Sequence, residues 1–321
     1  MTILVLGGQG MLGSALVRSL ANQKEEVIAH NRLACDLTDS WDTYDYIKQI
    51  RPTTIYHAAG LVGGILSNMN NQYDYLFKNV TMASNVINAA ATFSVPNLFY
   101  ISSSCVYPST CAQPMKENMI FDGQPEETNR GYALAKLVGM ELTKYARDGR
   151  HPAWYRGQQL NYLTMIPCNL YGPDDDFSIG GHVLASLIKK ICDAQRLNQK
   201  TITIWGSGAA FREFLHVDDC ASAITHVVNT LFESKKVAPD YINIGSGKEI
   251  SIMNLALLIR EIVGWNGEIL CDKSKPMGML RKLLDIQYLN DVQWSSKITL
   301  REGIERLANE YNASLLENQT Q

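Results

Sequence analysis

Two side chains suited to proton transfer lie four residues apart, at Tyr132 and Lys136. On a helix, this spacing puts the phenol and the ammonium on one face. A nearby ammonium stabilises phenolate and lowers the pKa of the tyrosine, which makes Tyr132 a usable general acid near neutral pH. The same spacing also occurs by chance in ordinary amphipathic helices, so the pair needs a second signal.

The second signal is a serine-rich segment upstream, from Ser102 to Cys105. It follows an apolar run at 98–101, which predicts the carboxyl end of a buried strand, where open α/β sheets bind ligands. A serine hydroxyl there can hydrogen-bond a substrate carbonyl beside Tyr132. Alternation along a strand turns Ser103 and Cys105 to the same side. On position alone, Cys105 could equally be a small buried apolar residue.

Glycines follow the first apolar run of the chain, at Gly7, Gly10 and Gly13. Glycine permits a tight turn and lets backbone N–H groups approach a pyrophosphate at a helix N-terminus. A glycine-rich turn alone is a weak signal, but it is much stronger at the start of a strand–helix–strand pattern. The segment therefore predicts a dinucleotide site, with a turn that binds nothing as the alternative.

The second predicted strand ends in His30-Asn31-Arg32 and carries no acidic residue there. NAD enzymes often use an acid at this place to hold the ribose 2′-hydroxyl, so its absence favours NADP. Arg32 or His30 could meet the 2′-phosphate, although Arg32 could also be a solvated loop residue. Asp36 and Leu37 could contact adenine, and Asp36 could equally cap the following helix.

Composition limits the class of protein. The chain has 321 residues, 46% of them hydrophobic, with a formal charge of −3 and a pI near 6.1. This suffices for one large domain or two lobes sharing a cleft, and offers no basic excess for nucleic acid or an anionic membrane. We expect neither a signal peptide nor a membrane span. Seven scattered cysteines without a CxxC pair favour a reduced, cytoplasmic protein, and no metal site is predicted.

Short apolar runs alternate with helical periodicity in the first half of the chain. Strands are expected at 2–6, 26–30, 53–59, 97–102 and 162–166, and helices at 11–22, 79–92 and 132–147. This alternation predicts a Rossmann-like doubly wound parallel sheet over residues 1–170, with helices on both faces.

The second half predicts a smaller C-terminal α/β lobe for the substrate over residues 171–321, with the chain crossing back to the sheet. Helices are expected at 180–195, 252–263 and 300–311, and a strand at 201–205. The polar stretch 148–159 is interpreted as a surface loop, with a distorted helix end as the alternative.

The glycine-rich loop, the serine-ended strand and the Tyr132/Lys136 pair identify the chain as a member of the extended short-chain dehydrogenase/reductase superfamily. Further segments resemble the GDP-L-fucose synthase family. They read VGGI at 62–65, SSCVYP at 103–108, PCNLYGP at 167–173, GHVL at 181–184, IWGSG at 204–208, REFLHVDD at 212–219 and RKLLD at 281–285.

The resemblance implies a reaction. GDP-4-keto-6-deoxy-D-mannose is epimerised at C3 and C5 and then reduced at C4 by NADPH to GDP-L-fucose. The matched positions assign the reduction to Ser103, Tyr132 and Lys136. They assign the epimerisations to Cys105 as base and His182 as acid; without the resemblance, His182 would be interpreted as a histidine that only begins a helix.

The same matched positions imply the binding residues. Expected contacts to NADP(H) are Gly7, Gln9, Gly10, Met11, Leu12, Gly13, Arg32, Asp36, Leu37, Ala58, Ala59, Tyr132, Lys136, Pro167, Asn169, Leu170 and His182. Expected contacts to the GDP-sugar are Ser104, Asn169, Lys190, Trp205, Arg212 and Lys282. Taken alone, Arg212 and Lys282 could equally be surface charges.

Carbonyl chemistry agrees with these roles. A C4 ketone acidifies the C–H groups at C3 and C5, because either carbanion is stabilised as an enolate. Inversion needs a base on one face and an acid on the other. Thiol and imidazole groups in general titrate near enough to neutral pH for these tasks.

The chain departs from the family pattern at several places. Gln9 stands where some members have an arginine for the 2′-phosphate, and the segments at 175–178 and 277–282 read DDFS and MGMLRK where DNFH and DGxxRK are common. The stretch 148–159 also resembles an insertion. Another GDP-4-keto-6-deoxy sugar, such as a heptose, is therefore the alternative substrate, with one or both chemistries.

The two helices predicted at 79–92 and 132–147 carry apolar residues on more than one face. They include Val80, Met82, Val86, Val138, Met140 and Leu142. In related enzymes these helices pair with those of a second subunit, which implies a homodimer. Burial of both helices against the sheet is the alternative.

Overall fold

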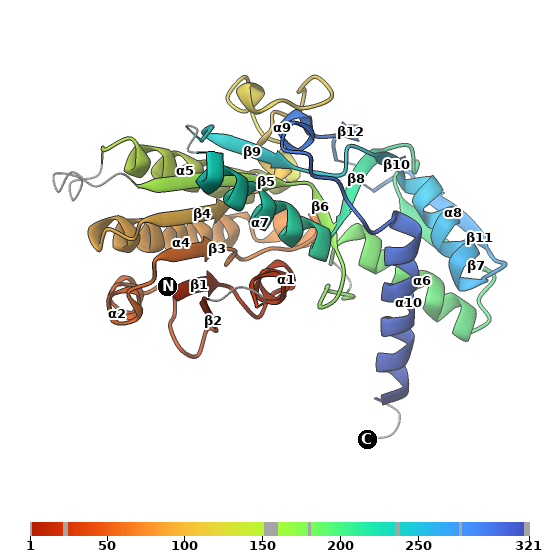
Figure 1. Ribbon diagram of the computed structural model, residues 1–321. Coiled ribbons are helices and arrows are strands. Elements are labelled where there is room, and N and C mark those ends of the chain that lie inside the picture. Colours follow the sequence, from red (N-terminus) through yellow and green to blue (C-terminus); the bar gives the residue numbers. More distant parts are fainter. Residues whose placement is uncertain are drawn as a thin grey trace.

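A computed structural model of the chain describes residues 2–21, 25–150, 160–178, 181–234, 238–275 and 278–317. Its centre is a six-stranded sheet in the order β2-β1-β3-β4-β5-β9 (Figure 1). The strands are β1 (Thr2–Leu6), β2 (Glu26–Ala29), β3 (Thr54–His57), β4 (Asn97–Ile101), β5 (Asn161–Pro167) and β9 (Tyr241–Ile244). All neighbouring strands pair in parallel. Most of the stretch predicted as a loop at 148–159 lies outside the described residues.

The chain leaves β1 on one side to form β2 and returns to its other side to form β3. This reversal opens a crevice at the carboxyl ends of β1 and β3, the place where doubly wound sheets bind ligands. All four residues of β3, and the last four of both β1 and β4, are buried. Such continuous burial is typical of parallel strands covered on both faces.

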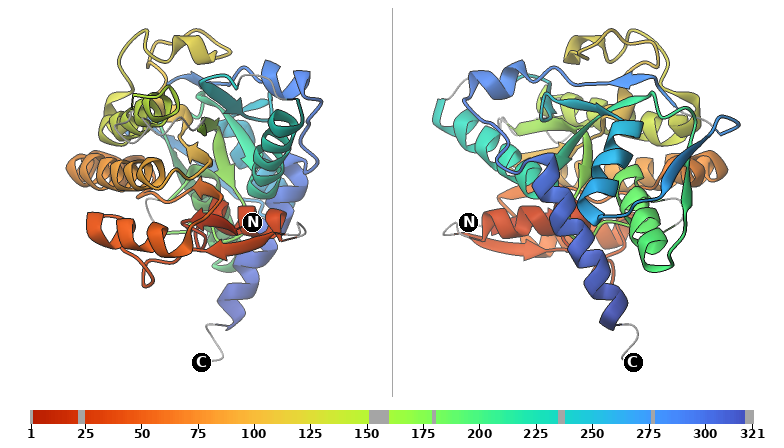
Figure 2. Two further views of the ribbon diagram at one scale, coloured as in Figure 1. Left: turned by 60° about the vertical axis from the view of Figure 1, so that its left-hand side comes forward. Right: turned by 90° about the vertical axis from the view of Figure 1, so that its right-hand side faces the viewer.

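Helices cover the two faces of this sheet. On one face, α4 (Gln72–Thr92) packs against α2 (Ser40–Ile50) and α5 (Arg130–Arg147). On the other face, α1 (Met11–Leu20) packs against α7 (Val217–Ser234). Figure 2 shows the two helical layers with the sheet between them. The predicted doubly wound sheet is confirmed.

Helix α4 begins seven residues before the start predicted from the sequence, at Gln72 rather than residue 79. Asn79 lies inside the helix and its amide holds a loop: Oδ1 accepts from the Leu61 N–H at 2.8 Å, and Nδ2 donates to the Leu61 carbonyl at 3.0 Å. The polar residue at 79 therefore serves a tertiary contact, and the helix continues through it.

A second, smaller sheet forms the C-terminal lobe. Strand β8 (Phe211–His216) pairs with β6 (Asn169–Tyr171), β10 (Glu249–Ser251) and β12 (Arg281–Lys282), while β7 (Thr201–Trp205) pairs with β11 (Glu268–Asp272). The helices α6 (Val183–Arg196), α8 (Ile252–Val263) and α10 (Leu300–Glu317) pack against one another beside these strands. Together they enclose a second hydrophobic core.

The chain crosses between the two lobes after residue 170. Cys168 belongs to the first core and Tyr171 to the second. Helix α7, strand β9 and α9 (Gln287–Asp291) then return residues to the first core. This arrangement supports the predicted division near residue 170, which stays a prediction. No helix within the described ranges is long and apolar enough to cross a membrane.

Candidate active site

A cavity of about 1460 Å³ runs from the glycine-rich loop after β1 into the C-terminal lobe. Sites for one small ligand usually measure about 300–1,000 Å³, so this cavity has room for more than one ligand group. Every residue predicted from the sequence to act in catalysis or to bind cofactor or substrate lines it. The fold therefore brings together segments spread from residue 7 to residue 282, while their individual roles stay predictions.

The glycine-rich loop needs its glycines for shape. Gly7 adopts φ +78°, a left-handed conformation that favours glycine. A Cβ added at Gly13 would lie 1.9 Å from the Gly7 carbonyl oxygen, so only glycine permits this close packing. Gly10 precedes α1 and gives the helix no side-chain cap. The first N–H groups of α1 thus face the cavity end where a phosphate would bind.

The end of β2 differs in part from the prediction. His30 is buried; its Nδ1 accepts from the Gly7 N–H at 3.3 Å, and its Nε2 lies 2.9 Å from the Cys35 carbonyl oxygen. Its contact with a 2′-phosphate is therefore a wrong prediction, because both ring nitrogens already hold the backbone. Burial lowers the pKa of His30. Arg32 is exposed, with its guanidinium 3.8 Å from Asp36, and it remains the candidate phosphate ligand.

The suggestion that Asp36 caps the next helix is also wrong. Its carboxylate accepts from both the backbone N–H and the hydroxyl of Thr38. Asp39 provides the cap of α2, since its Oδ1 accepts from the N–H groups of Trp41 and Asp42. Asp36 and Leu37 both line the cavity, as their predicted contact with adenine requires.

Ser103 and Tyr132 meet above the carboxyl end of β4. The Ser103 side chain lies close enough to the Tyr132 phenol to favour its ionised form, and the Ser103 Oγ accepts from the Cys105 N–H at 3.3 Å. Tyr132 comes from the first turn of α5, and its ring packs edge-on against Tyr75 of α4 at 6.3 Å. Two hydroxyls from different elements thus converge on one point of the cavity, where a substrate carbonyl oxygen could accept from both.

Lys136 lies one helical turn behind Tyr132 and is buried. Its Nζ donates to the Ile101 carbonyl oxygen at 2.8 Å and lies 5.8 Å from the centroid of the Tyr132 ring. Burial lowers the pKa of Lys136 to about 8 and raises the pKa of the Tyr132 phenol. The Tyr132 pKa is therefore raised where a lowering was predicted, and burial of the phenol is the main cause. A protonated phenol is nevertheless the form that a proton donor requires.

Cys105 lies in the same part of the cavity, and two donors face its sulfur. Asn129 Nδ2 lies 3.0 Å from Sγ, and Lys282 Nζ lies 3.3 Å from it. The family resemblance assigns Lys282 to the nucleotide, whereas the structure sets its ammonium beside the sulfur. A thiol with an ammonium and an amide at hydrogen-bond distance is unlike a packing residue in an apolar core.

Asn129 is a site residue that the sequence did not reveal. An asparagine directly before a helix is typical of an N-cap. Here its side chain makes no capping hydrogen bond to α5 and turns to Cys105 instead. Its position three residues before Tyr132 is the one sequence signal that could have drawn attention to it.

His182 lines the cavity at the start of helix α6. Its Nδ1 lies 2.7 Å from Oδ1 of Asp175, whose side chain is fully buried. The hydrogen bond to Asp175 raises the pKa of His182, and it outweighs the opposing effect of burial. An imidazole held in this way can remain protonated near neutral pH and act as an acid.

The remaining predicted substrate residues surround the outer part of the cavity. Lys190 Nζ donates to the Thr203 carbonyl at 3.3 Å, and burial lowers the pKa of both Lys190 and Arg212. Trp205 ends β7, with Lys275 Nζ 6.0 Å from its ring centroid. Two partly buried cations and an indole that line one cavity suit a nucleoside diphosphate.

Nearer the sheet, two further residues complete the lining. Asn169 is fixed by a hydrogen bond from its Nδ2 to the Glu213 carbonyl at 2.7 Å. Ser104 is buried in the short 3₁₀ turn after β4. Among the described residues, no group of three or more His, Cys, Asp or Glu side chains could hold a metal ion.

Comparisons with known proteins agree with this geometry. Residues 3–245 match the model of the NAD dependent epimerase/dehydratase family. The chain is 36% identical over 317 residues to a GDP-L-fucose synthase from Sinorhizobium fredii, covering 98% of this chain and 97% of the relative. It is also 36% identical over 307 residues to a GDP-L-colitose synthase from Yersinia pseudotuberculosis, covering 95% and 96%.

Among solved structures, the chain resembles a GDP-mannoheptose C4 reductase from Campylobacter jejuni with NADP bound. The TM-score is 0.84 at 27% identity, covering 97% of this chain and 98% of that one. The similarity extends through both lobes, so it includes the elements that build the whole cavity.

Proposed function

We propose an NADPH-dependent epimerase-reductase activity for this chain, which belongs to the NAD dependent epimerase/dehydratase family and, within it, to the GDP-L-fucose synthases. The proposed substrate is GDP-4-keto-6-deoxy-D-mannose and the proposed product is GDP-L-fucose. The observation that carries this proposal is the meeting of three groups in one cavity: the Ser103/Tyr132 donor pair, the Cys105 thiol and the His182 imidazole.

The glycine-rich loop fits a dinucleotide. Gly7 and Gly13 leave a cradle that a Cβ at either place would fill, and the uncapped start of α1 supplies N–H donors for the pyrophosphate. Arg32 lines the same cavity and is the proposed ligand of the 2′-phosphate. NADPH, when bound, supplies the hydride for C4. A reductase from C. jejuni with 27% identity was solved with NADP bound, which supports the choice of cofactor.

In the epimerisations, the chain's own groups move protons at C3 and C5. The sulfur of Cys105, as thiolate, takes the C–H proton, and the C4 carbonyl stabilises the enolate that results. The His182 imidazolium returns a proton to the opposite face of the same carbon. Lys282 and Asn129 hold the sulfur toward the sugar. Cys105 then loses its proton to solvent, and His182 regains one from solvent.

In the reduction, Ser103 and Tyr132 hold the C4 oxygen by hydrogen bonds. The Tyr132 phenol gives its proton to that oxygen as negative charge develops on it. Lys136 stays behind the phenol, anchored on the Ile101 carbonyl, and keeps positive charge near the point where the proton is lost. Burial raises the pKa of Tyr132, so the donor remains protonated throughout the neutral range.

A second candidate substrate is another GDP-4-keto-6-deoxy sugar, such as a heptose. The specific observation is the segment after Gly172, where this chain carries three consecutive aspartates, Asp174 to Asp176, at the cavity wall. The similarity to a GDP-mannoheptose C4 reductase supports the same alternative. A 4-epimerase with no net redox change is less well supported, because it needs neither Cys105 nor His182.

The assembly and the compartment are proposals too. Tyr73 and Phe77 of α4 and Val138 and Tyr145 of α5 are exposed apolar residues that a second subunit could cover, whereas Val86 and Met140 are buried in the core. These helices support a homodimer. All seven cysteines are free thiols, which supports the reducing cytoplasm as the compartment.

Incubation of the protein with GDP-4-keto-6-deoxy-D-mannose and NADPH tests the proposal. We expect NADPH to be consumed and the NMR spectrum of the product sugar to be that of L-fucose. A 6-deoxy sugar reduced at C4 but unchanged at C3 and C5 would show that the protein reduces this substrate without epimerising it. If the 4-keto sugar is not consumed, the proposed substrate is wrong, and GDP-4-keto heptoses are the next to be assayed.

A further inference from the structure

We propose that Asp175 is a positioning residue that orients His182 and sustains its positive charge as the acid of epimerisation. This inference rests on the proposed function. Oδ1 of Asp175 lies 2.7 Å from His182 Nδ1, and the Asp175 side chain is fully buried while 36% of the His182 side chain is exposed. Both residues line the cavity, and the imidazole is the more accessible of the two groups.

The pairing determines which ring nitrogen can act. A carboxylate only accepts hydrogen bonds, so His182 Nδ1 must carry a proton in this contact. The other nitrogen, Nε2, is then the one that can donate to a substrate carbon. Without the carboxylate, the ring could rotate or change tautomer, and the acid would be aimed incorrectly for part of the time.

The charge of Asp175 has few other partners. Oδ1 also accepts from the Asp176 N–H at 2.8 Å. Oδ2 is buried, and no donor within the described part of the chain reaches it. A buried carboxylate with one bare oxygen is costly unless a positive charge lies beside it, and His182 as imidazolium supplies that charge. The raised pKa of His182 has this same hydrogen bond as its main cause.

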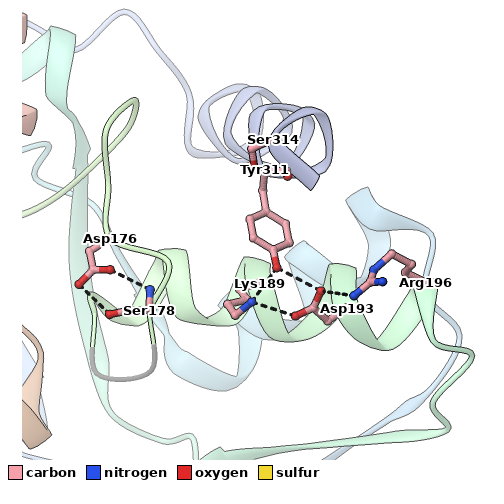
Figure 3. A network of polar contacts seen from close by, with 7 residues as sticks. All are labelled: Asp176, Ser178, Lys189, Asp193, Arg196, Tyr311 and Ser314. Atoms are coloured by element: carbon pink, nitrogen blue, oxygen red, sulfur yellow. Dashed lines mark hydrogen bonds and ion pairs between the residues drawn. The ribbon is translucent and has the colours of Figure 1, made fainter. Parts of the chain in front are cut away.

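The segment that holds Asp175 is itself anchored on both sides. The Asp174 carboxylate accepts from Ser14 Oγ of α1 at 3.1 Å. The next carboxylate, that of Asp176, accepts from both the N–H and the hydroxyl of Ser178, at 2.8 Å and 2.9 Å (Figure 3). Phe177 packs against Tyr311 of α10 with ring centroids 4.9 Å apart.

Tyr311 is fixed in turn by helix α6, the helix that His182 begins. Its hydroxyl lies 2.8 Å from Lys189 Nζ and 3.1 Å from Asp193 Oδ1 (Figure 3). Lys189 and Asp193 also pair with each other at 3.1 Å. The carboxylate and the imidazole therefore rest on one connected framework of α6 and α10, as a fixed acid requires.

The test is the variant Asp175→Asn, assayed in D₂O with GDP-4-keto-6-deoxy-D-mannose and NADPH. Asparagine keeps the size and an acceptor but removes the charge. We expect the rate of epimerised product to fall about 10- to 100-fold. Reduction of the unepimerised ketone should stay within about threefold and KM should not change, because Ser103 and Tyr132 are untouched. The product mixture therefore shifts toward the unepimerised 6-deoxy sugar.

Two controls separate positioning from general damage. Asp45→Asn makes the same change at an exposed carboxylate of α2 that does not line the cavity, and should keep the wild-type product ratio. The double variant Asp175→Asn/His182→Asn should epimerise no more slowly than His182→Asn alone, because Asp175 acts only through the imidazole. An additional loss in the double variant would indicate a structural role and overturn the inference.

A readout independent of turnover completes the test. The wild type should show a downfield proton resonance for His182 Nδ1, present in Asp45→Asn and absent from Asp175→Asn. Its absence from the wild type overturns the pairing even if Asp175→Asn does not fold. If the wild type epimerises and Asp175→Asn keeps the wild-type product ratio, the role of Asp175 is refuted while the proposed function stands. If the wild type does not epimerise the ketone, the proposed function fails and this inference with it.

Discussion

Replacing Tyr132 by phenylalanine isolates the proton donor of the reduction. The change removes one hydroxyl and keeps the ring, which packs against Tyr75 at 6.3 Å, so the fold and the cavity should persist. The phenol contact with the Ser103 side chain is lost, and the C4 oxygen loses the group that protonates it. A positioned general acid contributes about 10²–10⁴-fold, which corresponds to about 3–5 kcal/mol of transition-state stabilisation.

The magnitude should appear in one step only. We expect NADPH oxidation by Tyr132→Phe to fall by that factor, while NADPH binding stays within about threefold of the wild type. Exchange of C3 and C5 protons with solvent should continue, because Cys105 and His182 are unchanged. Single-turnover NADPH oxidation and NMR of the recovered ketone measure the two activities separately.

A matched control is available on the same helix. Tyr145 is an exposed tyrosine of α5, remote from the residues that line the cavity, and Tyr145→Phe should reduce the ketone at the wild-type rate. The assignment of Tyr132 as proton donor is refuted if Tyr132→Phe also reduces within about threefold of the wild type. If Tyr132→Phe loses both solvent exchange and reduction, the cavity itself is damaged.

Three further predictions concern the cofactor and the assembly. Gly13→Ala should weaken NADPH binding at least about tenfold in a titration, since its Cβ would lie 1.9 Å from the Gly7 carbonyl oxygen and overpacking costs about 1–3 kcal/mol; unchanged affinity would contradict the cradle. In steady-state kinetics, kcat/KM should be higher with NADPH than with NADH. Arg32→Ala should reduce the ratio of these two values, because it removes a phosphate ligand. An NADH preference in the wild type contradicts the role given to Arg32. Light scattering at micromolar concentration should report a dimer, and Phe77→Glu on the exposed face of α4 should shift it toward monomer; a monomeric wild type refutes the proposed use of α4 and α5.

The sequence alone predicted the features that depend on residues close together in the chain. The glycines after β1 predict a tight turn, and the spacing of Tyr132 and Lys136 predicts that both lie on one helix face. Both signals depend on residues close in the chain, and the structure sets Ser103 beside Tyr132 as the strand and helix predictions required.

Contacts between segments far apart in the chain could not be predicted from the sequence. The approach of Lys282 to Cys105 depends on a two-residue strand, β12, that pairs with β8. Burial also reversed one expectation: Lys136 was expected to lower the pKa of Tyr132, but desolvation of the phenol raises it. His30 appeared available for a phosphate, yet its ring supports the glycine-rich loop. Periodicity indicates the face of an element but not which polar groups meet across the fold.

The central claim is that one cavity performs both epimerisation and reduction, and solvent labelling tests it most directly. Wild-type protein is incubated in D₂O with GDP-4-keto-6-deoxy-D-mannose and NADPH, and the product sugar is analysed by NMR. We predict deuterium at both C3 and C5, because each inversion removes a carbon-bound proton and returns one from solvent, and no deuterium at C4, because its hydrogen comes from NADPH. A reduced product without deuterium at C3 and C5 would contradict the account, leaving Cys105 and His182 without the roles assigned to them.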